Sequence, residues 1–267
     1  MLIDVSTYVG HWPFRKVDGA TLNELAPVLA EHKITHAIVS NVNGIFYKDA
    51  MEGNLELYEE LKNYKGEVEF IPFAVINPSY INWREDMEKC VKELGFKGFD
   101  FTPAYHKHVL GEVCTLSDPC YKEAFKFAGE LGVPVRVENE YENFRQHHWM
   151  ESNLSPTGDQ FADMLSASDK TTLIIGGYFP DRMGARMAEI VKTRKNVFFN
   201  TRRLDPFYDA CYWQAAVNAV GCEHLVFGTN YPFTHIGPAE VALTFAPQTE
   251  EEKQAIMSEN IRGYLGL

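Results

Sequence analysis

Leu225-Val-Phe-Gly-Thr-Asn-Tyr-Pro-Phe233 begins as an apolar run and breaks abruptly at Gly228 into small and polar residues. A buried parallel strand ends in this way when its tip belongs to a site. The same form recurs near the N-terminus, where residues 2–8 lead into Gly10-His-Trp-Pro-Phe14. The two stretches are neighbours if the sheet closes into a barrel, and they predict its first and last strands.

Short apolar runs alternate with helical stretches between these two ends. The expected strands run from Leu2 to Tyr8, His36 to Asn41, Glu69 to Pro78, Phe96 to Pro103, Val133 to Asn139, Thr172 to Tyr178, Asn196 to Arg203, and onward from Leu225. Apolar residues at helical spacing predict the intervening helices. The first helix begins at about Thr21, and the last is opened by the capping box Thr249-x-x-Glu252. The helices between them are expected from Asn54 to Asn63, Trp83 to Leu94, Tyr121 to Leu131, Gln160 to Ser166, Arg182 to Lys192 and Asp209 to Val220.

Eight successive β/α units predict a (β/α)8 TIM barrel in the α/β class, as a single domain over residues 1–267. A doubly wound open sheet is the alternative. No G-x-G-x-x-G motif follows a strand, which disfavours the dinucleotide-binding version of that alternative. The residues between Glu140 and Thr157 form a long loop of the kind that builds a substrate wall.

Composition narrows the class of protein. A net charge of -12 disfavours a nucleic-acid partner, which needs clustered Lys and Arg. No apolar run is long enough to span a membrane and no cleavage signal opens the chain, so we expect a cytoplasmic protein. The five cysteines include no C-x-x-C pair and are expected to be reduced thiols.

Four stretches together resemble the amidohydrolase-related family, the "amidohydrolase 2" branch of metal-dependent TIM-barrel hydrolases and decarboxylases. They are Ile3-Asp-Val-Ser-Thr-Tyr-Val-Gly10, Gly95-Phe-Lys-Gly-Phe-Asp-Phe-Thr-Pro103, Phe227-Gly-Thr-Asn-Tyr-Pro-Phe233 and Asn260-Ile-Arg-Gly-Tyr-Leu-Gly266. The resemblance runs from one end of the chain to the other. It implies a barrel with its site at the carboxyl ends of the strands.

The metal ligands that the resemblance implies are replaced in this chain. Members of the family usually place a His-x-His pair at the tip of strand one, one histidine each at strands five and six, and an aspartate at strand eight. The corresponding positions are Ser6 and Tyr8, Glu138, Gly177, and Asn230. One carboxylate cannot make a three-ligand catalytic site, so we predict no metal cofactor. The alternative is a divalent ion such as Zn²⁺ at a rebuilt site.

Histidines near two strand ends are candidates for that rebuilt site. His106 and His108 follow strand four, and His147 and His148 lie in the long loop after strand five. Their spacing is not diagnostic of a metal site, and exposed polar histidines are the favoured interpretation.

Polar residues at the strand tips remain numerous. Strand alternation places Asp4, Ser6 and Tyr8 on one face. By the same rule, the residues that could face a single cavity are Ser6, Tyr8, Asp100, Thr102, Glu138, Asn200, Arg202 and Asn230. Two interpretations stay open. In the first, Arg202 forms an internal ion pair with Glu138 or Asp100. In the second, Arg202 or Arg203 binds an anionic substrate group, and Glu138 or His11 acts as acid or base.

The segment after strand one is aromatic. Trp12 and Phe14 are expected to cover the barrel mouth, or else to line a flat apolar pocket with the cation of Arg15 at its edge. A small aromatic or alicyclic acid would fit such a pocket. The predicted catalytic residues are Glu138, His11, Asn230 and Asp100, and the predicted substrate-binding residues are Arg202, Arg203, Tyr8, Trp12, Arg15, His147 and Tyr231.

Two functions from different classes follow. The first is an enzyme, a hydrolase or decarboxylase by resemblance, that acts on a small carboxylated or cyclic metabolite. The second is a non-catalytic barrel that binds a small anion or partners an active relative. We expect a small-molecule partner, no nucleic acid and no membrane, and aromatic residues in the long loop make a homodimer a further expectation.

Overall fold

A computed structural model describes residues 1–106, 114–142, 148, 150–151, 154–178, 180–204 and 211–267. Its strands are β1 (Ile3–Val9), β2 (His36–Asn41), β3 (Glu69–Ile76), β4 (Gly98–Phe101), β5 (Val135–Glu138), β6 (Leu173–Gly176), β7 (Val197–Asn200) and β8 (Leu225–Val226). Its α-helices are α1 (Leu22–Glu31), α2 (Asn43–Phe46), α3 (Ala50–Asn63), α4 (Trp83–Lys92), α5 (Pro119–Leu131), α6 (Gly158–Leu165), α7 (Gly184–Thr193), α8 (Cys211–Val220), α9 (Ile236–Thr244), α10 (Glu250–Gln254) and α11 (Asn260–Leu265).

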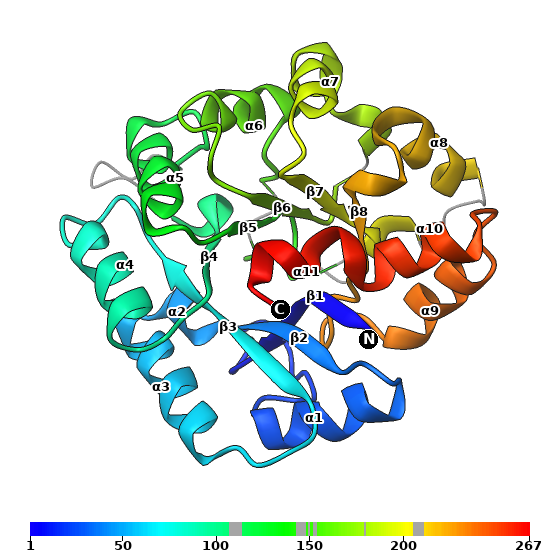
Figure 1. Ribbon diagram of the computed structural model, residues 1–267. Coiled ribbons are helices and arrows are strands. Elements are labelled where there is room, and N and C mark those ends of the chain that lie inside the picture. The colour runs from blue at the N-terminus through cyan, green and yellow to red at the C-terminus, as the bar shows by residue number, and fades with distance from the viewer. Residues whose placement is uncertain (107–113, 143–147, 149, 152–153, 179, 205–210) are drawn as a thin grey trace.

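The eight strands form one parallel sheet in the order β1 to β8. The chain at β8 returns to β1, where Val5 N donates to Phe227 O at 3.0 Å and Tyr8 N donates to Tyr231 O at 3.1 Å. These bonds bring the two edges of the sheet together, and helices surround the strands (Figure 1). The predicted (β/α)8 barrel is confirmed.

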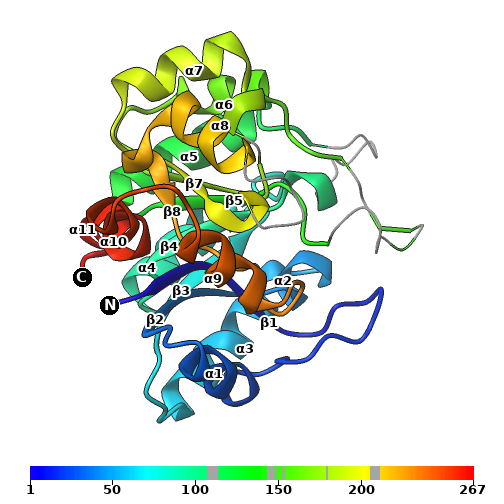
Figure 2. The same cartoon turned by 90° about the vertical axis from the view of Figure 1, so that its right-hand side faces the viewer.

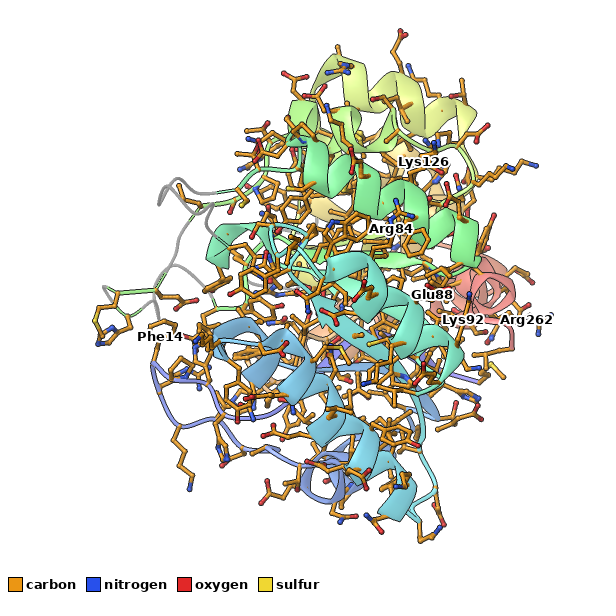
Figure 3. The ribbon with its side chains drawn as sticks, turned by 90° about the vertical axis from the view of Figure 1, so that its left-hand side faces the viewer. Phe14, Arg84, Glu88, Lys92, Lys126 and Arg262 are labelled. Carbon is orange, nitrogen blue, oxygen red and sulfur yellow. The ribbon has the colours of Figure 1, made fainter. Side chains whose placement is uncertain are left out.

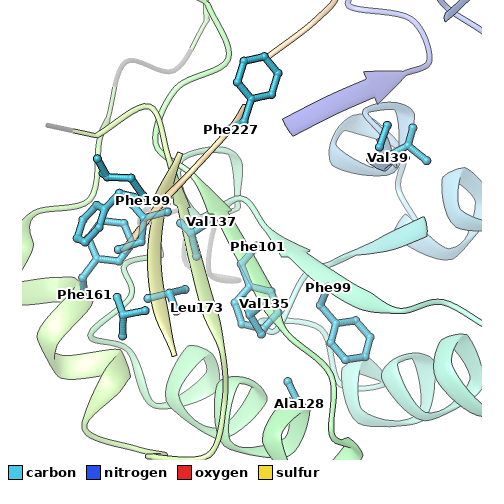
Figure 4. Close-up of a cluster of buried hydrophobic side chains, with 14 of the residues drawn as sticks. Val39, Phe99, Phe101, Ala128, Val135, Val137, Phe161, Leu173, Phe199 and Phe227 are labelled. Atoms are coloured by element: carbon cyan, nitrogen blue, oxygen red, sulfur yellow. The ribbon is translucent and has the colours of Figure 1, made fainter. Parts of the chain in front are cut away.

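Two apolar layers hold the barrel. Large side chains such as Phe99, Val135 and Leu173 point outward and pack between the strands and the helices (Figure 4). Inside the barrel, Ile3, Ile38 and Ile174 meet Ile261 and Leu265 of α11. Helix α11 lies across the end of the barrel where the strands begin (Figure 1). The end of the barrel where the strands begin is therefore filled by an apolar core.

The connections that follow the strands gather at the other end. The loop after β1 extends there, away from both chain termini (Figure 2). Phe14 marks this end and Arg262 of α11 marks the opposite one (Figure 3). In a parallel barrel the site lies at the carboxyl ends of the strands, which is the end that Phe14 marks.

Local signals set several boundaries. The capping box expected at Thr249 is present, with Glu252 N donating to Thr249 Oγ1 at 3.2 Å and Thr249 N donating to Glu252 Oε2 at 2.8 Å. Helix α3 starts four residues earlier than expected, because the Asp49 side chain accepts a hydrogen bond from Met51 N. Helices α2 and α9 were not predicted. No helix in the described part of the chain is long and apolar enough to cross a membrane.

Candidate functional site

A buried guanidinium lies inside the barrel, above the apolar core and toward the carboxyl ends of the strands. Arg136 of β5 is fully buried, and its Nη2 donates to Asp100 Oδ2 at 2.7 Å and to Ser40 Oγ at 2.8 Å. Its Nη1 donates to Val5 O at 3.0 Å, and the group lies 4.5 Å from the centre of the Tyr8 ring. Four strands therefore hold one cation inside the barrel.

A second ion pair lies at the tips of β5 and β7. Arg202, in the turn that follows β7, places Nη1 2.6 Å from Glu138 Oε1. The other carboxylate oxygen, Oε2, accepts hydrogen bonds from Ser6 Oγ and Tyr8 Oη, each at 3.1 Å. Both oxygens of Glu138 are thus engaged by residues of β1 and of the turn after β7. Of the two interpretations left open above, the structure contains the internal ion pair.

Two glycines make room for this carboxylate. A Cβ atom on Gly176, at the end of β6, would lie 2.0 Å from Glu138 Oε2. A Cβ atom on Gly177 would lie 2.7 Å from Glu138 Oε1 and 2.9 Å from Arg202 Nη1, and Gly177 also has a positive φ of +63°. Any larger residue at either position would displace the ion pair. The two glycines at the end of β6 therefore leave the space that the Glu138 carboxylate occupies.

The first residues after β5, Glu140 and Tyr141, are held by hydrogen bonds from the ends of β7 and β8. The carbonyl oxygen of Tyr141 accepts hydrogen bonds from Arg202 Nη2 at 3.0 Å and from Asn230 Nδ2 at 2.6 Å. Arg202 Nη1 also donates to the carbonyl oxygen of Glu140. Asn230 makes this contact from a left-handed backbone conformation with a φ of +62°, which asparagine tolerates better than most residues. Asn230 and Arg202 therefore position the backbone at Glu140 and Tyr141.

Aromatic side chains cover the ion pairs. The Tyr141 ring lies 5.0 Å from Tyr8 and 5.4 Å from both Trp12 and Phe233. Trp12 also meets Phe14 at 5.4 Å, and only 5% of its surface is exposed. Most of these contacts are edge-to-face, which suits the charge distribution of aromatic rings. Trp12 therefore belongs to the aromatic cover, and it also lines the pocket described below.

Burial dominates the acid–base chemistry of these groups. It raises the pKa of the Tyr8 and Tyr141 hydroxyls well above the ordinary value, so both stay protonated as donors. Burial is the largest influence and acts to lower the pKa of Arg136, but the Asp100 carboxylate and the neighbouring Tyr8 and Tyr141 together outweigh it, so the net pKa lies above the ordinary value. Arg136 is thus a permanent buried cation.

A pocket of about 480 Å³ opens beside this cover. The loop between β1 and α1 surrounds it, and a bond from Gly10 N to Ala20 O at 2.8 Å ties the ends of that loop together. Four of the predicted site residues line the pocket, namely His11, Trp12, Arg15 and Tyr231. Arg15 bonds to the carboxylate of Glu142 and to Phe233 O. The candidate residues therefore divide into an interior group and a pocket group.

The interior group contains Glu138, Asp100, Asn230, Arg202 and Tyr8. Two other predicted residues are not placed in either group: the side chain of Arg203 and the whole of His147 lie outside the described residues. His148 stacks on Phe14 with ring centres 5.8 Å apart. That His147 and Arg203 bind substrate therefore stays a prediction.

Two expectations about individual side chains are wrong. Asp4 does not share a face with Ser6 and Tyr8, because the pairing of β1 with β2 shifts register between Asp4 and Thr7. Its carboxylate accepts instead from Thr229 Oγ1 at 2.5 Å and from Ser6 N at 2.9 Å. Burial raises the pKa of Asp4 to about 6.

His106 is the other correction, since it is buried rather than exposed. Its Nε2 lies 3.0 Å from Thr102 Oγ1 and its Nδ1 lies 2.6 Å from Tyr121 Oη. Burial lowers the pKa of His106 to about 3, which keeps the ring neutral. Because both ring nitrogens have partners, His106 and Thr102 fasten the chain after β4 to α5 and do not join the interior group.

Arg136 is the residue that sequence reasoning missed. A signal was available, because Arg136 and Glu138 stand two residues apart in Val135-Arg-Val-Glu138 and strand side chains alternate. If Glu138 faces the interior, Arg136 must face it as well. An arginine at the middle of a barrel strand then needs a carboxylate partner, and Asp100 on β4 is the neighbouring candidate.

Comparison with known proteins identifies the family. A sequence model described as Amidohydrolase matches residues 16–267, and the chain belongs to this amidohydrolase family. No curated protein sequence matched the chain.

Solved structures share the fold. The structure is similar to 2,6-dihydroxybenzoate decarboxylase in complex with 2,6-dihydroxybenzoate, at 17% identity and a TM-score of 0.75, over 100% of this chain and 99% of the other. It is also similar to a dihydroxybenzoic acid decarboxylase from Polaromonas with bound manganese, at 15% identity and a TM-score of 0.73, over 100% and 97%. A 5-carboxyvanillate decarboxylase from Sphingomonas paucimobilis follows at 12% identity and a TM-score of 0.70, over 100% and 99%. At these identities the likeness shows the fold alone.

The residues at the strand ends do not suit the metal ion that the family implies. Both oxygens of Glu138 already bind Arg202, Ser6 and Tyr8, and the Arg202 guanidinium would repel a divalent cation at that carboxylate. The described residues include no group of three or more His, Cys, Asp or Glu side chains that could hold a metal.

Proposed function

We propose that this protein is an amidohydrolase-family hydrolase or decarboxylase that acts on a small carboxylated or cyclic metabolite without the histidine-bound metal of its relatives. The site lies at the carboxyl ends of the strands. Its interior group supplies Glu138 and Asp100 as acid–base groups and Arg202 as a fixed cation, and the adjacent Arg136 is a second fixed cation.

The Arg202–Glu138 pair with its two hydroxyl donors is the observation that carries this proposal. Burying four charges is expensive, and a barrel that only needed filling could use apolar residues. The pairs instead stand at the functional end of the barrel, where an anionic substrate would meet a guanidinium in place of a metal ion.

The 480 Å³ pocket supports the substrate class. It places the Trp12 and Tyr231 rings near the cations Arg15 and Lys16, an environment that suits a small ring bearing a carboxylate. His11 lies at the same pocket and is the proposed general acid or base there. The decarboxylases of similar fold act on carboxylated aromatic compounds, which agrees with this class but does not select a substrate.

A non-catalytic barrel that binds a small anion, or that partners an active relative, is the second candidate. The absence of turnover in this candidate is favoured by the saturation of Arg202, whose described contacts all go to this chain's own Glu138, Glu140 and Tyr141. A guanidinium held in this way can serve a structural role without turnover.

One set of measurements separates the two candidates. Protein purified without chelator is assayed for bound Zn, Mn and Fe. Turnover is followed with and without EDTA for 2,6-dihydroxybenzoate, 5-carboxyvanillate and 2-pyrone-4,6-dicarboxylate, the last being the compound for which a hydrolase of similar fold is named. Turnover that persists in EDTA and falls by about 10²-fold or more in Glu138→Gln supports the proposal.

Other outcomes count against it. Stoichiometric metal that is needed for turnover overturns the metal-free site. Binding of these acids without turnover, lost in Arg202→Ala, supports the anion-binding alternative. Tyr80→Phe is a suitable control variant because Tyr80 is 40% exposed and lies outside both groups.

A further inference from the structure

Several polar atoms inside the barrel have no hydrogen-bond partner among the described residues. Three of them belong to one neighbourhood: Asp100 Oδ1, Arg136 Nε and Tyr141 Oη. Asn200 Nδ2 and Asn230 Oδ1 are likewise unpartnered, at the tips of the strands on the other side of the barrel. Each of these five side chains is at most 1% exposed. Bulk solvent therefore does not serve them.

The first three atoms belong to side chains that pack in one neighbourhood. Asp100 and Arg136 share a hydrogen bond through their other atoms, at 2.7 Å. The Arg136 guanidinium lies 4.5 Å from the centre of the Tyr8 ring, and the Tyr141 ring lies 5.0 Å from the same ring. Tyr141 therefore packs beside the residue that contacts the Asp100–Arg136 pair, and its backbone is held by Arg202 and Asn230.

The chemistry of the free positions selects the occupant. Arg136 Nε can only donate, Asp100 Oδ1 accepts, and Tyr141 Oη can do either. The two ion pairs balance to zero formal charge, so a charged ligand would add an uncompensated charge to a dry interior. An uncharged group that both donates and accepts hydrogen bonds satisfies all three positions.

We propose that Asp100, Arg136 and Tyr141 form a buried binding position within the interior part of the site, for uncharged donor–acceptor groups. In the resting protein the occupant is tightly held water, since buried polar atoms of this kind are met by water with two to four partners. During turnover a hydroxyl or amide group of the substrate takes its place, and this second part rests on the proposed function. The site is separate from the 480 Å³ pocket, whose lining includes none of these three residues.

Two matched Tyr→Phe substitutions test the resting occupant. Tyr8→Phe removes a hydroxyl that donates to Glu138 at 3.1 Å, and Tyr141→Phe removes one that has no partner among the described residues. Both rings are 1% exposed, so the loss of packing is equal. If water occupies the site, both variants lower Tm by roughly 2 to 5 °C. A Tyr141→Phe protein that melts at or above the wild-type temperature would overturn the proposal, because an unsatisfied hydroxyl is better removed.

Crystallography provides a second measurement on the wild type. Electron density within hydrogen-bond distance of at least two of the atoms Asp100 Oδ1, Arg136 Nε and Tyr141 Oη supports the site. A well-ordered interior with no density there contradicts it, whatever the stability of the variants.

Acetamide and acetate test the ligand class, because they share size and differ in charge. The difference between their effects on Tm is measured in the wild type and in Tyr141→Phe at equal concentration. A wild-type difference of roughly 1 °C or more in favour of acetamide, lost in the variant, supports the class. Equal effects of the two probes restrict the site to water, and a preference for acetate rejects the uncharged class. None of these readouts uses turnover, so they remain informative if the proposed activity fails.

Discussion

The Arg202 guanidinium lies 2.6 Å from Glu138 Oε1, and both side chains are buried at the mouth of the barrel. This pair joins the tip of β5 to the turn after β7, and Arg202 also donates to the carbonyl oxygens of Glu140 and Tyr141. Removing one partner leaves the other charge buried and alone.

We predict that Arg202→Met lowers the free energy of unfolding by about 3–5 kcal/mol, measured by urea denaturation. The double variant Arg202→Met/Glu138→Met should recover a large part of that loss, because it removes both charges. Arg186→Met is the control. Arg186 pairs with Asp163 at the surface with half of its side chain exposed, and its loss should cost about 0–1 kcal/mol. Equal losses for Arg202 and Arg186 would contradict a buried, energetically coupled pair.

Gly176→Ala tests the fit between β6 and Glu138. Its Cβ would lie 2.0 Å from Glu138 Oε2, and three donors hold that carboxylate in place, so we expect a loss of about 1–3 kcal/mol. Gly263→Ala in α11 is the matched control, because nothing lies within 4 Å of its Cβ. An alanine there should leave the unfolding free energy unchanged or raise it by about 0.5–1 kcal/mol. A Gly176→Ala protein as stable as the control would mean that Glu138 is not confined.

Asp4 should make stability depend on pH. Burial raises its pKa from 3.8 to about 6 in the folded chain, so the folded protein holds this proton more tightly than the unfolded chain. The stabilisation is full below the unfolded pKa and is lost as the pH rises through about 6, an effect of about 3 kcal/mol. The unfolding free energies of wild type and Asp4→Asn are compared from pH 4 to pH 8. The variant should gain on the wild type as the pH rises, and a constant difference would show that Asp4 titrates normally.

Chelation should leave stability unchanged. The oxygens of Glu138 are occupied by Arg202, Ser6 and Tyr8, so a divalent ion would have to break three bonds to bind there. Melting temperatures with and without EDTA are therefore expected to agree within about 1 °C. A lower Tm in EDTA that added Mn²⁺ or Zn²⁺ restores would show that a metal binds the folded protein.

Much of the fold was predictable from local pattern. Strand β2 spans the residues that alternation predicted, His36–Asn41, and the capping box at Thr249 opens a helix. Strand β4 is shorter than predicted, because Thr102 turns aside to bond His106 and so ends the ladder. Helices α2 and α9 carry weaker local signals, and α2 has only four residues.

The candidate site was predictable only in part. Sequence reasoning placed Glu138, Asp100, Asn230 and Tyr8 at the strand ends, because a period of two fixes which side chains share a face. It misplaced Asp4, since the register shift in β1 leaves no mark in the alternation. It also overlooked Arg136, whose partners come from β1, β2 and β4.

By itself, the sequence determined a parallel barrel of eight β/α units and the set of polar residues at its carboxyl ends, because periodicity and helix caps act over a few residues. Only the tertiary structure decided which of these residues meet. Val5 and Arg136 are 131 positions apart, and Ser6 and Glu138 are 132 positions apart. Their contacts depend on the register and closure of the whole sheet, and so does the exclusion of water that gives the buried charges their energy.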